Sequence, residues 1–365
     1  MGGVRWLLLL LGLGACSEYG FGTTPDPATG GPGGDPSDPT DPHPNGPGDG
    51  DTADTRSPPP DCDRLAHPTV QWLPWIPDGQ LTRHYRATDF DADGEMIGTS
   101  SSGQEQDVVR YGALGGVQEV SPDIASPQWI ERRPRTLADG RIAIGASGTV
   151  DIYDPQEGTL DRRVSFQGYP GPRTFASVEA ASDGMFFVIG MRADGGWGIS
   201  RADPSTGQTE QVADWKDHPN GWGFGLHHEL ALSTAEDWLY VLAGVGSQHH
   251  LLAFPNHRGT LGEPVMRLLD ADIPDVDDEM QLAVDACGHL YLFADGTLWG
   301  VAADSDQAEP LVHLPDVVYA PELFWGHDAG YADPQSLYVT GFSDGIRPVR
   351  YAVHLGVSGN HVLSR

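Results

Sequence analysis

Hydrophobic residues beyond position 61 fall into short runs of three to five, separated by polar turns rich in Asp and Gly. Runs such as Phe186–Gly190 and Leu290–Phe293 are nearly all β-branched, aromatic or leucine, which is typical of strands buried on both faces. No segment keeps a helical period. The pattern therefore predicts an all-β protein and argues against an α/β fold.

The turns recur along the chain at a nearly constant spacing. Aligned turn positions are Gly94, Gly140, Gly184, Glu236, Gly288 and Pro334. Successive positions differ by 46, 44, 52, 52 and 46 residues, and further strand-like runs follow each turn. A period in this range with several strands per unit is the signature of a propeller blade. The sequence thus predicts a six-bladed β-propeller over residues 61–365.

The ring must close, and the sixth unit lacks a fourth strand after Val353. Two segments are candidates: Val70–Leu73 near the start of the domain and His361–Leu363 near its end. The first would also account for the position of Cys62, just before the propeller.

The N-terminus reads as an export signal. Arg5 precedes an apolar stretch, Trp6–Leu13, which is too short to span a bilayer. It ends in Leu-Gly-Ala-Cys16, which resembles the lipobox of bacterial lipoproteins. The resemblance implies that residues 1–15 are removed, that Cys16 receives the lipid (palmitate-type acyl chains) and becomes the mature N-terminus, and, from Ser17, that the protein is sorted to the outer membrane of the cell envelope.

The segment between Cys16 and the propeller is dominated by Pro, Gly and Asp. With Tyr19 and Phe21 as its only large apolar residues, residues 16–60 cannot bury enough surface to offset the entropy of ordering. We expect a disordered tether with an end-to-end distance of about 35 Å.

Charge narrows the class of partner. A formal net charge of -31 and a pI near 4.5 exclude nucleic acid as a partner, since that needs a basic surface. We expect a monomer held at the membrane by its lipid, with a protein, peptide or glycan as ligand.

With Cys16 lipidated, two cysteines remain. In an exported protein, Cys62 and Cys287 are expected to form one disulfide; two separate thiols are the alternative.

Leu282–Leu292 and Leu230–Val241 resemble blade segments of the senescence-marker and gluconolactonase family of six-bladed propellers, and Ser336–Thr340 resembles its last-blade phrase. The resemblance implies lactone hydrolysis at a divalent metal held by an acidic residue, an asparagine and an aspartate at the ring centre. The corresponding positions here are Arg86, His228 and Met280. None is the expected ligand, because arginine does not bind cations and methionine sulfur is soft. We therefore expect the lactonase metal site to be absent.

Nearby residues form a candidate binding site at shifted positions. His228, Glu229, Glu279 and Glu322 stand near the starts of inner strands and would suit zinc or another divalent cation if they converged. Polar residues also line the water-filled channels of propellers, which is the favoured interpretation. The prediction is a binding or scaffolding module without a cofactor; a metal-dependent hydrolase of the lactonase type is the alternative.

Three further patterns could mark sites or could have ordinary structural explanations. Asp89–Gly94 alternates acids like a calcium loop, but it aligns with the other turns and has Ser100 where an EF-hand needs Glu. Histidine pairs occur at His227–His228 and His249–His250, and adjacent residues on a strand point to opposite faces. The aromatic residues that either line a binding mouth or pack between blades are Trp197, Trp222, Trp299 and Trp325. No nucleophile elbow or phosphate-binding loop is present.

Overall fold

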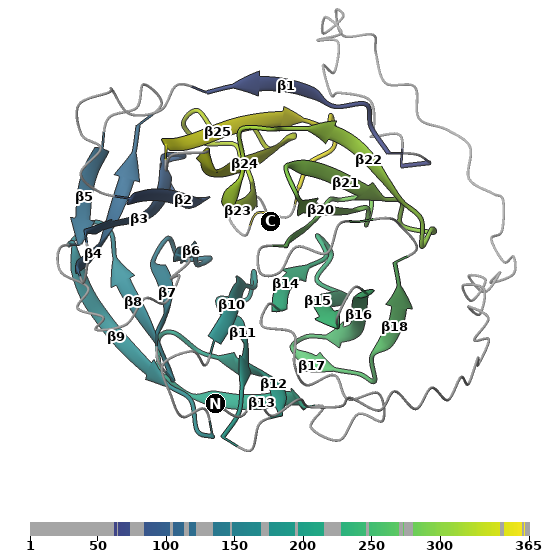
Figure 1. The fold of residues 1–365 in the computed structure, drawn as a ribbon. Coiled ribbons are helices and arrows are strands. Elements are labelled where there is room, and N and C mark those ends of the chain that lie inside the picture. Colours follow the sequence, from purple (N-terminus) through teal and green to yellow (C-terminus); the bar gives the residue numbers. More distant parts are fainter. Residues whose placement is uncertain are drawn as a thin grey trace, which may run out of the picture. The chain divides into compact units, whose positions relative to one another are not determined.

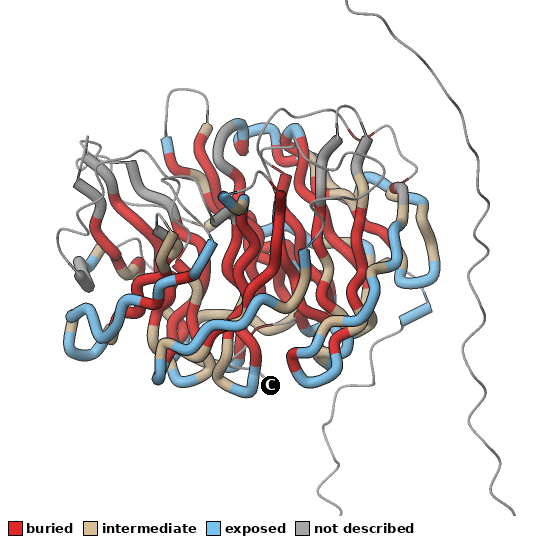
Figure 2. The backbone as a smooth tube through the Cα atoms, turned by 90° about the horizontal axis from the view of Figure 1, so that it is seen from below, coloured by how far each residue is buried: buried red, intermediate tan, exposed pale blue. Residues whose placement is uncertain are grey.

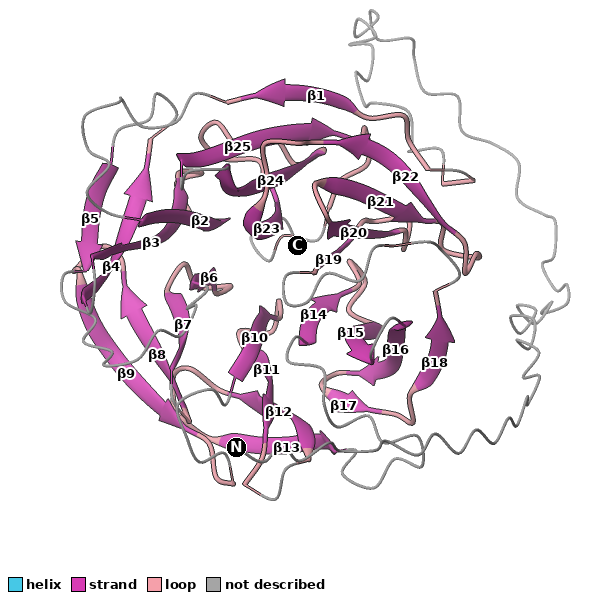
Figure 3. Ribbon diagram, viewed as in Figure 1, coloured by secondary structure: helices cyan, strands magenta, loops and turns pink. Residues whose placement is uncertain are grey.

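Each sheet of this protein is formed by strands that follow one another along the chain, with a single exception at the ring closure. The computed structural model arranges six antiparallel sheets around one axis (Figure 1). The structure describes residues 62–361 apart from residues 64, 147 and 360 and the segments 74–83, 103–104, 113–116, 122–133, 169–174, 194–195, 215–227, 246–247, 270–272, 274–279 and 344–346. The predicted all-β, six-bladed propeller is confirmed, and the described residues contain no helix (Figure 3).

The strands are grouped in blades of four, with a fifth strand in the fourth blade. Blade 1 contains β2 (His84–Phe90), β3 (Met96–Ser102), β4 (Glu105–Tyr111) and β5 (Val117–Ser121). Blade 2 contains β6 (Pro134–Thr136), β7 (Ile142–Ala146), β8 (Thr149–Asp154) and β9 (Thr159–Ser165). Blade 3 contains β10 (Phe175–Ala180), β11 (Phe186–Met191), β12 (Trp197–Ala202) and β13 (Thr209–Asp214).

Blade 4 contains β14 (His228–Leu232), β15 (Trp238–Val245), β16 (Gln248–His257), β17 (Thr260–Leu261) and β18 (Val265–Leu268). Blade 5 contains β19 (Gln281–Val284), β20 (Leu290–Ala294), β21 (Thr297–Val301) and β22 (Ala308–His313). Blade 6 contains β23 (Tyr319–Trp325), β24 (Ser336–Ser343), β25 (Arg347–His354) and β1 (Thr69–Trp72). None of the described residues belongs to a helix long and apolar enough to cross a membrane.

One backbone pattern ends the innermost strand of every blade. A residue that we call the closing residue donates its N–H across the turn to the start of the second strand; the closing residues are Asp91, Leu137, Ala181, Ser233, Asp285 and Gly326. Most of the turns that follow contain a glycine with positive φ, such as Gly94 (φ 76°) and Gly184 (φ 85°). In the sixth blade Gly326 N–H donates to Ser336 O, so the residue just before this acceptor, the place that Gly94 takes before Glu95, is Gln335 and not Pro334.

Six apolar clusters fill the six seams between neighbouring blades. Residues on alternate positions of each inner strand contribute to different seams, as Leu282 packs toward blade 4 and Ala283 toward blade 6. Buried positions fill the strands, and exposed positions fall mainly in turns and outer strands (Figure 2). Each fully buried Leu, Ile or Phe side chain contributes about 1.5–3 kcal/mol, so the seams hold the ring together.

The ring is closed by the N-terminal candidate. β1 pairs antiparallel with β25, from Thr69 opposite His354 to Trp72 opposite Tyr351. The alternative that His361–Leu363 supplies the fourth strand is wrong, because His361 is buried against the channel instead. All four β1 residues are exposed, so backbone hydrogen bonds are its main attachment.

The predicted disulfide is confirmed. Cys62 and Cys287 are bonded, with 5.3 Å between their Cα atoms and a sequence separation of 225. The Cys62 carbonyl also lies 3.2 Å from His289 Nε2, whose other ring nitrogen lies 3.2 Å from Asp285. The bond thus fixes the segment leading to β1 against blade 5.

Candidate functional site

The innermost strands β2, β6, β10, β14, β19 and β23 contact one another in sequence around a central channel (Figure 1). The space between them, with its openings to solvent, measures about 530 Å³. It is lined by Asp89, Arg135, Thr136, Glu179, Ala180, Leu230, Ala231, Leu232, Leu282, Ala283, Val284, Leu323, Phe324, Trp325 and His361. All but His361 belong to inner strands, close to their closing residues.

Position in the repeat explains this lining. The residues two positions before the closing residues form a ring at one height, which we call the lower ring: Asp89, Arg135, Glu179, Ala231, Ala283 and Phe324. Blades 1 to 3 contribute charged side chains to it, and blades 4 to 6 contribute apolar ones. The channel therefore has a charged half and an apolar half, although the six blades repeat one fold.

The carboxylates of the charged half hold neighbouring blades together. Asp89 Oδ2 accepts the backbone N–H of Thr136 in the next blade at 2.8 Å. Glu179 Oε1 accepts the N–H of Leu232 in the same way at 3.3 Å. These N–H groups lie on the free inner edge of a sheet, where an unsatisfied donor would cost about 1–3 kcal/mol. Both acids therefore have a structural role.

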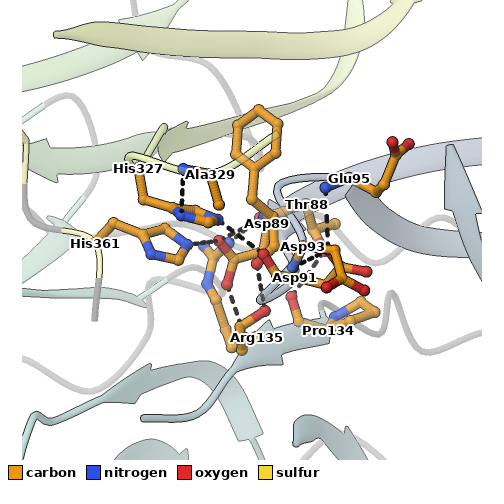
Figure 4. A network of polar contacts seen from close by, with 12 residues as sticks. Thr88, Asp89, Asp91, Asp93, Glu95, Pro134, Arg135, His327, Ala329 and His361 are labelled. Carbon is orange, nitrogen blue, oxygen red and sulfur yellow. Dashed lines mark hydrogen bonds and ion pairs between the residues drawn. The ribbon is translucent and has the colours of Figure 1, made fainter. Parts of the chain in front are cut away.

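Asp89 also binds a residue from the far end of the chain. His361 Nε2 lies 3.0 Å from Asp89 Oδ1, and the His361 ring stacks on His327 with 4.6 Å between centroids (Figure 4). His327 Nε2 lies 2.8 Å from the carbonyl oxygen of Asp91, and its Nδ1 accepts the N–H of Ala329 at 3.2 Å. Since a carbonyl can only accept, His327 carries its proton on Nε2 and is neutral.

Burial and neighbouring charge tune these groups. Burial alone would raise the pKa of Asp89, but His361, Arg135 and the Thr136 N–H together hold that pKa below its usual value. Burial, with a further contribution from His361, lowers the pKa of His327. The carboxylate of Asp89 and the neutral ring of His327 are therefore the stable forms at neutral pH.

Two of the four predicted binding residues are buried near the channel, four positions before their closing residues. Glu229 is 4% exposed and Glu322 is 0% exposed. The equivalent residue in the blade between them is Gln281, which is 1% exposed. His228 begins β14; Glu279 lies outside the described residues, as do Cys16 and the tether.

Of the three positions that correspond to lactonase metal ligands, Met280 has a described side chain. Met280 is buried in the apolar cluster between blades 4 and 5. Arg86 lies on β2, and a guanidinium cannot ligate a cation. The loss of the lactonase ligand set stays a prediction.

Among the described residues, one group has metal-ligand chemistry at short range: Asp285, Cys287 and His289, whose ligand atoms lie within 4.8 Å of one another. The sulfur of Cys287 is bonded to Cys62 and is no thiolate. Asp285 accepts the Tyr291 hydroxyl at 2.8 Å. This group anchors the disulfide and is a poor metal site.

The calcium-like sequence at Asp89–Gly94 is a hairpin turn. Asp91 Oδ1 accepts the N–H groups of Asp93 and Glu95, each at 3.0 Å, and its Oδ2 pairs with Arg110 at 2.5 Å. Its oxygens are thus used within the turn, while Asp89 points to His361.

Of the four tryptophans considered for a binding mouth, the three whose side chains are described pack between blades. Trp197 and Trp325 are buried in seam clusters, and Trp299 packs partly buried against another. Trp222 and His227 lie outside the described residues. In blade 4, His228 on β14 and His250 on β16 are both paired with Ala243 on β15, the strand between them.

No protein-family profile matches the chain, and no curated protein matches it. Solved structures do. A gluconolactonase from Xanthomonas campestris is similar at 16% identity over 80% of this chain and 91% of its own, with a TM-score of 0.54. A luciferin-regenerating enzyme is similar at 14% identity over 80% and 97% of the two chains, with a TM-score of 0.53.

An auxiliary nutrient binding protein from Bacteroides ovatus is similar at 12% identity over 79% and 77%, with a TM-score of 0.51. The likeness is one of fold. It confirms the propeller inferred from the repeats, and it includes both enzymes and a binding protein.

Reasoning from sequence missed the role of His361. It has no motif, and its partner Asp89 lies 272 positions away. Gln281 takes the same place in the repeat as Glu229, but an uncharged amide gives no signal of a site in the sequence.

Proposed function

We propose that this chain is a lipid-anchored envelope protein whose propeller binds a protein, peptide or glycan at the channel end where the inner strands begin. Cys16 would carry the anchor, and residues 16–60 would hold the propeller away from the membrane. The monomeric propeller would then act as a binding or scaffolding module.

The C-terminal residues carry this proposal. His361 and Gly359 are buried at the turn end of the channel, where the six turns follow the closing residues. A ligand approaching from that end meets the protein's own chain, so the opposite end is the favoured mouth. The acids Asp89 and Glu179 are already bound to backbone donors, which also favours a binding surface over a reactive centre.

Binding to arrays of defined glycans and peptides tests the proposal. We expect a ligand whose binding is weakened at least tenfold by Glu322→Gln and unchanged by Glu309→Gln, an exposed control on β22. Equal effects of the two substitutions would contradict a binding site at the channel.

The anchor is tested separately by labelling cells with radioactive palmitate. Label should be present on the natural chain and absent from Cys16→Ser. Label retained on Cys16→Ser would refute this anchor.

A second candidate, a metal-dependent hydrolase, is favoured by one observation. Glu229, Gln281 and Glu322 are buried at the same height on three consecutive blades, and two carboxylates with an amide oxygen suit a hard cation. Elemental analysis after dialysis against calcium or zinc separates the two functions. A stoichiometric cation that is lost on Glu229→Gln, together with chelator-sensitive lactone hydrolysis, would support the hydrolase and contradict the binding-only module.

A further inference from the structure

The last described residues, Leu355–Gly359 and His361, cross the turn end of the channel; we call them the C-terminal clasp. Backbone hydrogen bonds fix the clasp to two blades. On the blade 6 side, Leu355 N–H donates to Gln335 O at 2.9 Å and Gly359 N–H to Pro334 O at 3.0 Å. On the blade 5 side, Ala286 N–H donates to Ser358 O at 2.9 Å.

His361 extends the clasp to a third blade. Its contact with Asp89 reaches the end of β2 in blade 1. His361 is 4% exposed, Asp89 is 5% exposed and His327 is 3% exposed. The clasp therefore ties blades 5, 6 and 1 together on the channel side, while β1 closes the same blade 6 at its outer edge.

The clasp fits one backbone path closely. Gly359 lies so close to the indole of Trp325 that a Cβ at this position would overlap the ring atoms. Val357 is 4% exposed and packs in the seam between blades 5 and 6. Glycine is required here by close approach, so the clasp can be released by adding a single methyl group.

Acid acts against the innermost contact of the clasp. A second proton on His327 would fall on Nδ1, which accepts the Ala329 N–H, and would put two cationic imidazoles face to face whenever His361 is also protonated. The carboxylate facing this pair is Asp89, which interacts with Arg135 as well. Asp91 contributes its carbonyl, while its carboxylate pairs with Arg110.

We propose that the C-terminal clasp is an acid-sensitive latch, in which protonation of His327 drives His361 out of the channel and opens its turn end. In the closed state burial and His361 lower the pKa of His327. In the open state that pKa returns toward its ordinary value of about 6.5. Acid below that pH therefore favours the open state, by up to about 30-fold at pH 5 for one proton. A proton on His361 strengthens its attraction to Asp89, so the latch acts through His327.

Hydrogen exchange of the full-length chain, read by mass spectrometry, tests the latch. The reporters are the amides of Leu355 and Gly359, and of Ala286, whose acceptor lies in the clasp. After correction for the intrinsic exchange rate at each pH, we expect protection to fall between pH 7.5 and pH 5, by at most about 30-fold.

His327→Gln should abolish that fall, since an amide can keep a donor for Asp91 O and an acceptor for Ala329 N–H without titrating. His327→Phe is a second non-titrating variant that keeps a ring against His361. The control is His313→Gln on the exposed strand β22, which should behave like the natural chain.

Gly359→Ala should give low protection of the Ala286 amide at both pH values, because its methyl group displaces the clasp without a proton. An equal fall in the natural chain and in both His327 variants, or no fall in the natural chain, would overturn the proposal. This experiment reads the turn end alone, so its outcome is independent of the ligand proposed for the opposite mouth.

Discussion

Adding one methyl group at Gly94 should destabilise the ring far more than the same change at Gly184. The two glycines occupy equivalent positions in the corresponding turns of blades 1 and 3, with φ of 76° and 85°. Around Gly184 an added Cβ would meet nothing within 4 Å. At Gly94 it would overlap the carbonyl of Ala329, because the turns of blades 1 and 6 interlock there through Gly330.

The two costs can be separated. A left-handed φ costs a non-glycine residue about 1–2 kcal/mol, and both variants lose this amount. Only Gly94→Ala must also displace backbone atoms of blade 6, which costs a further 1–3 kcal/mol, roughly. The difference between the variants, about 1–3 kcal/mol, measures how tightly the seam between the first and last blades is packed.

Urea unfolding followed by tryptophan fluorescence measures this difference. Both midpoints should fall, and Gly94→Ala should fall further with an unchanged slope. A difference smaller than about 0.5 kcal/mol, the margin within which independent changes in free energy add, would refute the tight seam.

Three further results are expected from urea unfolding. The free energy of unfolding of the double variant Cys62→Ala with Cys287→Ala should be lower by about 3–5 kcal/mol, since the disulfide closes a 225-residue loop. Reductant should lower the urea midpoint of the natural chain to that of the variant. Equal midpoints without reductant would contradict the expected loss. Arg350 is buried, and burial lowers its pKa. Arg350→Met should therefore leave the free energy of unfolding nearly unchanged, while Arg350→Ala leaves a cavity and should lower it by about 2–5 kcal/mol. Similar losses for the two variants would contradict this reasoning. Hydrogen bonding to Asp285 raises the pKa of His289. The contribution of His289 to the free energy of unfolding is therefore complete below about pH 6.5 and is lost as the pH rises through the raised pKa. His289→Gln should remove this dependence of the free energy of unfolding on pH, and a dependence that persists would assign it to another group.

The architecture was predictable because it is local and repeated. Each blade restates one signal, a buried run followed by a turn with a left-handed residue, so errors at single positions such as Pro334 did not change the count. Ring closure was not decidable from sequence, because both Val70–Leu73 and His361–Leu363 have the length of a strand. The N-terminal segment forms the strand, and the bond from Cys62 to blade 5 leads it to blade 6.

The channel was less predictable because its chemistry does not repeat. The lower ring changes from charged side chains, such as Asp89 and Glu179, to apolar ones, such as Ala231 and Phe324, at positions with identical backbone roles. Each inward acid is explained by the donor that the next blade presents to it, and that donor is known only once the blades are placed side by side. The same holds for His361, whose burial depends on the closed ring. The blades repeat because each must fold and pack in the same way. The contacts that distinguish one end of the channel from the other come from residues that depart from the repeat. Variants that test ligand binding and the latch should be made at these positions first.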